Sequence, residues 1–235
     1  MNRKWTVLAA VTVIATGCST RTDKTAHPTS TTPAFSATVD NPWFPLKPGT
    51  TLTYRGIKDG KSSRDVFTIT RETRVIDGVR CAVVRDSLYL AGALEEKTTD
   101  WYTQDRKGNV WYYGEDTETL DPAGHVTSTE GSWRAGKNGA RPGVFMPAKP
   151  NAGQAGQQEF YAGHAEDHFQ ILDNAASVKV PAITTKSALL TKEWTPLEPG
   201  VVDHKYYVRG IGTVLEQAIK GDTEVNRLIS IKSAP

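Results

Sequence analysis

The chain contains 235 residues, of which 38% are hydrophobic and 23% are charged, with 20 Gly, 13 Pro and 2 Cys. This composition is typical of a globular protein and excludes a collagen, a coiled coil or a wholly disordered chain. The formal charge of +2 comes from Arg3 and Lys4, so a chain that begins at Cys18 has 26 basic and 26 acidic side chains. Because nucleic-acid binding needs a basic surplus, this balance argues against a nucleic-acid partner.

The N-terminus has the features of an export signal. Basic residues at 3 and 4 precede an apolar run over 5–16, which is shorter than the roughly 20 residues that span a bilayer. The sequence Ala15-Thr16-Gly17-Cys18 then resembles the lipobox of bacterial lipoproteins, although Ala15 stands where Leu is more usual. We therefore predict a lipoprotein signal peptide over 1–17 and attachment of diacylglycerol and palmitate-type chains at Cys18. The alternative is an ordinary secretory signal with an incidental cysteine.

These features predict a protein held by lipid on the extracytoplasmic face of the cell membrane. Residues 18–40 are rich in Ser, Thr and Pro, which favours a flexible tether after the acylated cysteine. A single β domain is predicted over 41–235. Its first segment contains Trp43, Phe44 and Leu46 among prolines that prevent a helix, so these side chains could plug the end of a sheet.

Beyond Gly49 the chain alternates between strand and turn patterns. β-Branched and aromatic residues predict strands at 50–57, 64–76, 79–90, 94–104, 109–115, 157–161, 168–172, 176–180, 186–194, 204–209, 212–219 and 225–232. Asp77-Gly78 is the residue pair that a two-residue hairpin turn requires. No long segment has a helical period, so the predicted fold is all-β. It is an antiparallel meander forming a strongly curved sheet, half-barrel or barrel, with a long Gly/Pro-rich loop over 131–156.

Two short segments repeat a turn pattern. Residues 105–110 and 121–126 both read Asp-x-x-Gly-(Asn or His)-Val, which predicts two successive hairpin turns. They lie in a region, residues 86–130, that contains ten acidic side chains. Converging carboxylates could hold a hard cation, but the spacing of a calcium loop is absent. A solvated acidic face is the favoured interpretation of this region.

One motif carries a family resemblance. The segment Asp100-Trp101-Tyr102-x-Gln104-Asp105-x-x-Gly108-Asn109-Val110-Trp111-Tyr112-Tyr113-Gly114-Glu115 resembles a group of uncharacterised bacterial secreted proteins and lipoproteins. Residues 41–49, 158–167 and 207–214 are similar as well, so the resemblance covers much of the chain. It implies an envelope location and a curved antiparallel sheet, and it brings no established activity.

Aromatic and acidic side chains suggest a ligand site. The candidates are Trp101, Trp111, Tyr113, Glu115, Trp133, Glu159 and Tyr161. Strand alternation predicts that Trp111, Tyr113 and Glu115 share one face, with Trp133 able to close over a ligand stacked on Trp111. Aromatic rings beside a carboxylate suit a sugar or a cationic ligand. The alternative is an aromatic layer of the core.

A weaker signal concerns metal. On a strand, His164, Glu166 and His168 would point to one side, where they could hold zinc or copper, although a solvated turn is the more ordinary interpretation. No cofactor is predicted. Cys81 would lack a partner if Cys18 is acylated, and it is expected in a buried strand.

The sequence therefore favours a lipid-anchored, non-enzymatic binding module whose ligand is a lipid, a glycan or a small molecule. One alternative is a hydrolase of envelope glycans or peptides that uses paired carboxylates from Glu115, Glu159, Glu166 and Asp167. The other is a structural lipoprotein that docks a protein partner.

Overall fold

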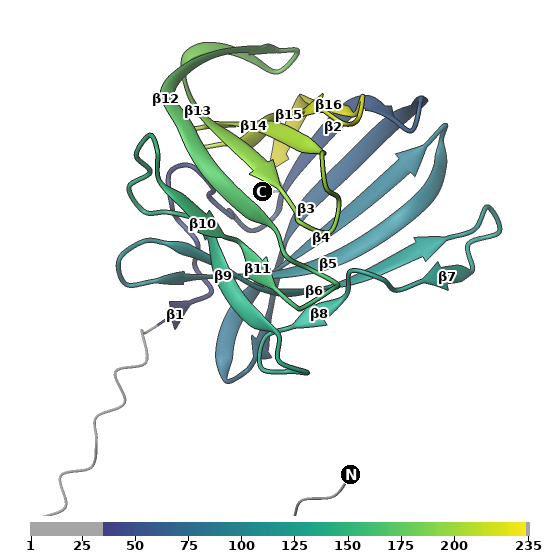
Figure 1. Cartoon of the computed structure of the whole chain (residues 1–235), viewed down its shortest axis with the longest axis horizontal. Helices are drawn as coiled ribbons and strands as arrows, with labels where there is room; N and C mark the ends of the chain where they lie inside the picture. Colours follow the sequence, from purple (N-terminus) through teal and green to yellow (C-terminus); the bar gives the residue numbers. More distant parts are fainter. Residues whose placement is uncertain (1–34, 234–235) are drawn as a thin grey trace, which may run out of the picture. The chain divides into compact units, whose positions relative to one another are not determined.

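The computed structural model describes residues 35–233, which form a nearly closed, barrel-shaped antiparallel sheet (Figure 1). No helix in this part of the chain is long and apolar enough to cross a membrane. The predicted signal peptide and Cys18 lie outside the described residues. The all-β, antiparallel, strongly curved fold is confirmed.

The described chain contains sixteen strands. Their bounds are β1 (Phe35–Ser36), β2 (Thr50–Lys58), β3 (Lys61–Ile76), β4 (Val79–Leu90), β5 (Ala93–Asp105), β6 (Val110–Leu120), β7 (Val126–Ser128), β8 (Trp133–Arg134), β9 (Arg141–Met146), β10 (Ala155–Gln157), β11 (Glu159–Phe160), β12 (His168–Val180), β13 (Ile183–Trp194), β14 (Val202–Val208), β15 (Gly212–Lys220) and β16 (Val225–Ser233).

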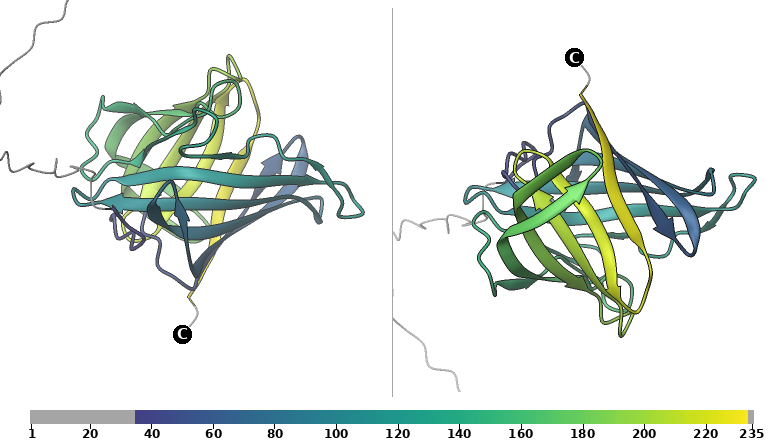
Figure 2. Two further views of the ribbon diagram at one scale, coloured as in Figure 1. Left: turned by 90° about the horizontal axis from the view of Figure 1, so that it is seen from below. Right: turned by 90° about the horizontal axis from the view of Figure 1, so that it is seen from above.

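The sheet follows the chain for most of its path. Its order is β10-β12-β13-β14-β15-β16-β2-β3-β4-β5-β6-β9-β11, and β16 joins the C-terminal half to β2. Figure 2 shows the β12–β16 half crossing the β3–β6 half at a steep angle. The path begins at β10 and ends at β11, which are consecutive in the chain, so the segment over 155–160 crosses the single seam of the barrel.

Local sequence signals explain most of the turns. Asp77 and Gly78 have φ values of 46° and 75°, and Ile76 pairs with Val79, so the predicted two-residue hairpin turn is confirmed. Asp105 closes the β5–β6 turn by accepting from the backbone N–H groups of Lys107 and Asn109, at 2.9 Å each. Asp121 repeats this arrangement in the β6–β7 turn, as the repeated pattern predicts.

The predicted plug closes one end of the barrel. Trp43, Phe44 and Leu46 are all at most 5% exposed. Asn41 fixes this segment, because its side-chain amide donates to the carbonyls of Gly108 and Pro147 at 2.9 and 3.1 Å. An apolar segment without regular structure therefore becomes part of the core through hydrogen bonds to two neighbouring loops.

Two predicted boundaries differ from the structure. The tether was expected to reach residue 40, but β1 pairs with β5 and Val39 bridges to Leu46, so residues 35–40 already belong to the domain. Val39 is 3% exposed, which gives this segment an apolar anchor that its Ser/Thr-rich composition obscured. The Gly/Pro-rich segment over 131–156 is not one continuous loop, because it contains β8, β9 and part of β10.

Candidate functional site

The interior of the barrel is hollow and acidic. Three cavities share lining residues: a plug cavity of about 170 Å³ beside Phe44, a seam cavity of about 310 Å³ beside Trp194, and a rim cavity of about 280 Å³ beside Lys58. Together they are lined by twelve carboxylic side chains and two lysines. The acids are Asp65, Asp86, Glu96, Asp100, Glu115, Glu159, Asp167, Glu193, Glu198, Asp203, Glu216 and Glu224, and the lysines are Lys58 and Lys205.

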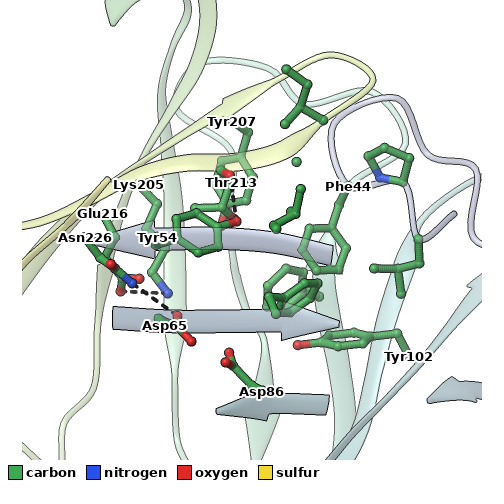
Figure 3. Close-up of a pocket in the computed structure, with 17 residues that line it drawn as sticks. Phe44, Tyr54, Asp65, Asp86, Tyr102, Lys205, Tyr207, Thr213, Glu216 and Asn226 are labelled. Carbon is green, nitrogen blue, oxygen red and sulfur yellow. Dashed lines mark hydrogen bonds and ion pairs between the residues drawn. The ribbon is translucent and has the colours of Figure 1, made fainter. Parts of the chain in front are cut away.

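Strand alternation places an apolar zone next to these acids. On β3 the inward residues change from Phe67 to Asp65, and on β5 they change from Tyr102 to Asp100, in each case two positions along the strand. The apolar zone adjoins the plug, where Phe44 packs against Phe145 with ring centroids 4.5 Å apart. The plug cavity therefore has an aromatic wall on one side and carboxyl groups on the other (Figure 3).

One interior lysine is held between two acids. Lys205 Nζ lies 3.1 Å from Glu193 Oε2 and 3.1 Å from Glu216 Oε1. Glu193 also accepts from the Tyr207 hydroxyl at 2.9 Å and from the Thr191 hydroxyl at 2.8 Å. The two glutamates raise the pKa of Lys205 well above its usual value, although burial opposes them, so this ammonium stays charged inside the barrel.

Three other interior carboxyls have strongly raised pKa values. Burial raises the pKa of Asp100, Glu115 and Glu159 to about 8 each, and neighbouring carboxyls add to the shift. Tyr112 donates to Asp100 at 2.6 Å, and the Trp133 indole donates to Glu159 at 2.6 Å. These donors only partly offset the burial, so the three groups hold protons near neutral pH.

The predicted shared face of Trp111, Tyr113 and Glu115 is wrong. Asp100 pairs with Glu115 and Tyr102 pairs with Tyr112, so one residue of β5 faces two residues of β6. This β-bulge includes Gly114, whose φ is +135°, and it reverses the alternation along β6. Glu115 consequently lines the interior, whereas Trp111 and Tyr113 pack against Phe35 in edge-on contacts at 6.0 and 5.6 Å.

The other aromatic candidates also separate. Trp101 is fully buried beneath the guanidinium groups of Arg74 and Arg134, at 4.9 and 5.2 Å. Trp133 does not cover Trp111; it packs edge-on against Tyr112 at 5.5 Å. Of the predicted ligand-site residues, Glu115, Glu159 and Trp133 therefore come together around Tyr112, which the prediction omitted.

The predicted metal ligands have separate partners. His164 Nδ1 lies 2.8 Å from Glu130 Oε1, and its ring stacks on Tyr161 at 4.4 Å. His168 Nδ1 forms a hydrogen bond with the backbone carbonyl of Glu166 at 2.8 Å. The side-chain carboxylate of Glu166 accepts a hydrogen bond from Gly163 N–H at 2.7 Å. Over residues 35–233 no group of three or more His, Cys, Asp or Glu side chains is arranged to hold a metal ion.

The acidic region over 86–130 is not simply a solvated face. Asp86, Glu96, Asp100 and Glu115 line the interior cavities. Asp105 accepts from its own turn and from the Trp111 indole, and these hydrogen bonds lower its pKa against the opposing effect of burial. Hydrogen bonds from His125 and Ala123 likewise lower the pKa of Asp121. Cys81 is fully buried, as predicted, and burial raises its pKa to about 12, which is unsuited to a reactive thiolate.

Two interior acids were missed by sequence reasoning because each has a basic residue directly before it. Asp65 follows Arg64, and Glu193 follows Lys192. On a strand such neighbours point to opposite faces, so a basic exterior and an acidic interior cancel within any short window of sequence. The recurring basic-acidic pair within strongly β segments was the available signal.

Comparisons with known proteins add little. No family model and no curated protein sequence matches the chain. A crystal structure of "a putative lipoprotein from Parabacteroides distasonis" aligns with 81% of this chain and 98% of its own, at 11% identity and a TM-score of 0.42.

Proposed function

We propose that this chain is an extracytoplasmic lipoprotein, anchored at Cys18, whose barrel binds a small organic molecule in its interior. The observation that carries the proposal is the plug cavity, about 170 Å³ of open space between an aromatic wall and a set of carboxyl groups. Barrels of this kind either fill their interior with side chains or enclose a ligand. A water molecule needs only about 10–15 Å³ on the same scale, so this space has room for a small molecule.

The carboxyls that the sequence predicted for hydrolysis do not have the pKa values that this chemistry uses. Glycoside hydrolysis uses one protonated and one ionised carboxyl whose pKa values the site drives apart. Burial instead raises the pKa of Glu115 and Glu159 to about 8 each and also raises the pKa of Asp167. Glu166, a further candidate for such chemistry, uses its carboxylate to accept from Gly163 N–H outside these cavities.

Lipid anchoring is tested by fractionation. Cys18→Ser should release the protein from the membrane fraction or leave an unprocessed precursor, because the thiol that would receive the diacylglycerol is gone. Ser30→Ala, in the predicted tether, is the control and should stay on the membrane. A processed Cys18→Ser protein that still sediments with membranes would contradict the anchor.

Ligand binding is tested by identifying what the barrel carries. The full chain, isolated from its own cells, is denatured, and the released small molecules are analysed by mass spectrometry. Ile211→Trp should reduce the recovered ligand, because Ile211 lines the plug cavity, whereas Ile219→Trp on the exposed face of β15 should not. Equal recovery from both variants, or recovery of nothing from the unmodified chain, argues against an interior binding site.

A further inference from the structure

Three unpartnered acceptors belong to side chains that line the plug cavity. Asp65 Oδ1, Asp86 Oδ1 and Asn226 Oδ1 are closed to solvent and accept no hydrogen bond from a protein donor among residues 35–233. All three side chains line both the plug cavity and the rim cavity. A buried acceptor without a donor lowers the stability of the fold. Three such acceptors at one place point to an occupant rich in hydrogen-bond donors.

The two aspartates face each other. Figure 3 shows Asp65 and Asp86 pointing toward one another from the neighbouring strands β3 and β4, with Phe44 and Tyr102 across the cavity. Burial, followed by the charge of Asp86, raises the pKa of Asp65 well above its usual range, while burial raises the pKa of Asp86 to about 6. A proton on the Asp65 carboxyl removes the repulsion that two facing carboxylates would have. In the absence of a ligand, this single proton therefore reduces the charge repulsion between the two carboxyls, as a bound cation would.

Elsewhere in the interior, lysine ammonium groups balance the charge of carboxylates. Lys205 places an ammonium between Glu193 and Glu216, and Lys58 Nζ lies 3.2 Å from Glu224 Oε2. Neither lysine forms an ion pair with Asp65 or Asp86 in the described part of the chain. Asn226 donates to Asp65 Oδ2 at 3.2 Å, which leaves the other oxygen free for a donor from outside.

The aromatic wall of the cavity favours a ligand that also has an apolar group. Phe44 packs edge-on against Phe67 and Tyr102, with centroids 6.2 and 5.2 Å apart, and Phe145 completes the wall. Such a surface accepts an aromatic ring or a short aliphatic chain. The surrounding acids repel anions, and the described residues contain no arrangement suited to a metal ion.

From this juxtaposition we propose that the plug cavity binds a primary organic ammonium, with its ammonium on Asp65, Asp86 and Asn226 and its apolar group against Phe44 and Tyr102. The inference rests on the proposed binding function and names the class of its ligand. Binding exchanges one cation for another: the ammonium donates to both ionised carboxylates, and the proton on Asp65 leaves for solvent. A primary ammonium has three donors, one for each unpartnered oxygen.

The test is calorimetric titration of the full chain in lipid nanodiscs, with empty nanodiscs as the blank. The probes are 2-phenylethylammonium, 2-phenylethanol, phenylacetate and the N,N,N-trimethyl form of the amine. The primary ammonium should bind at least about tenfold more tightly than each of the others, because only it supplies both charge and donors. Titration near pH 7 in two buffers of different ionisation enthalpy should show release of about one proton for each ligand bound.

Substitution then locates the charge. The double variant Asp65→Asn with Asp86→Asn keeps the shape of both side chains and should lose about tenfold or more of the affinity for the ammonium, with 2-phenylethanol unaffected. Asp203→Asn, an acid of the neighbouring seam cavity, is the control and should retain the affinity. Thermal melts check that all variants fold, and the probe series on the unmodified chain does not depend on them.

The outcomes separate the two proposals. If the alcohol or the trimethyl form binds as tightly as the primary ammonium, or if no proton is released, the ammonium site is overturned while a binding cavity remains. If none of the probes binds but a neutral or acidic molecule is recovered from the chain, the ammonium site is again overturned and the binding function stands. If no probe binds and no molecule is recovered, both proposals fail.

Discussion

Replacing Lys205 with methionine tests whether the interior acids depend on an internal cation. Methionine keeps most of the apolar stem and removes the ammonium that lies 3.1 Å from both Glu193 and Glu216. The Glu193 side chain is only 7% exposed, so its charge would be left buried without a cation. Glu216 is 33% exposed and can recover part of its hydration.

The size of the loss follows from this burial. Removing one partner of a buried ion pair costs about 3–5 kcal/mol, and the partial exposure of Glu216 places this case near the lower end, at about 3 kcal/mol. For a domain of this size that loss lowers Tm by about 6–12 °C. The loss should shrink at pH 5, because protons can then neutralise the interior negative charge that the lysine no longer balances.

Urea denaturation at pH 7.5 and pH 5, followed by tryptophan fluorescence, measures both effects. Lys186→Met, on the exposed part of β13, is the matched control and should change stability by less than about 0.5 kcal/mol at either pH. A Lys205→Met loss that is the same at both pH values would refute the reasoning, because it would arise from packing and not from an unpaired charge.

Three further predictions address the interior protons, the bulge and the outer aromatic layer. Asp100, Glu115 and Glu159 each have a pKa of about 8, so the folded state holds more protons than the unfolded state between pH of about 4 and 8. The free energy of unfolding should therefore fall as pH rises through this range. A higher Tm at pH 8 than at pH 5.5 would contradict this. Gly114→Ala should lower the free energy of unfolding in urea by more than about 2 kcal/mol, because its Cβ would lie 2.4 Å from the Trp133 carbonyl oxygen. The control Gly92→Ala also has a positive φ, +91°, but no atom lies near its Cβ, so it should cost only backbone strain of about 1 kcal/mol. Trp111→Ala should lower stability by about 2–4 kcal/mol and leave ligand affinity unchanged, because Trp111 packs against Phe35 outside the cavities; a selective loss of binding would restore it as a ligand residue.

The strands and tight turns were predictable because their signals are local. Asp77-Gly78 fixes a turn through its own backbone preferences, and the Asp105 carboxylate caps the turn that follows it. The side of the sheet to which a side chain points depends less on local sequence. A single extra residue at Gly114 reverses which side of β6 points inward, and nothing in the alternation of the sequence announces that insertion.

The site was harder to predict than the fold because it is assembled from many strands. Asp65, Asp86, Glu193 and Glu216 come from four strands spread over most of the domain, and no short window contains more than two of them. Their convergence depends on closure of the barrel between β16 and β2. The Asp-x-x-Gly turns were conspicuous in the sequence because the hydrogen bonds of their aspartates join residues that are close together in the chain.

The balanced charge of the chain conceals a segregation that links stability to binding. The described residues contain 24 basic and 25 acidic side chains, yet twelve acids and only two lysines line the interior cavities. Burial and mutual repulsion raise the pKa of Asp100, Glu115 and Glu159, and the same repulsion lowers the stability of the barrel. A cation that enters relieves this repulsion and stabilises the folded state in proportion to its affinity and concentration. A fold selected only for stability would have filled these positions with apolar side chains, so the acidity of the interior is the feature that the proposed cation site accounts for.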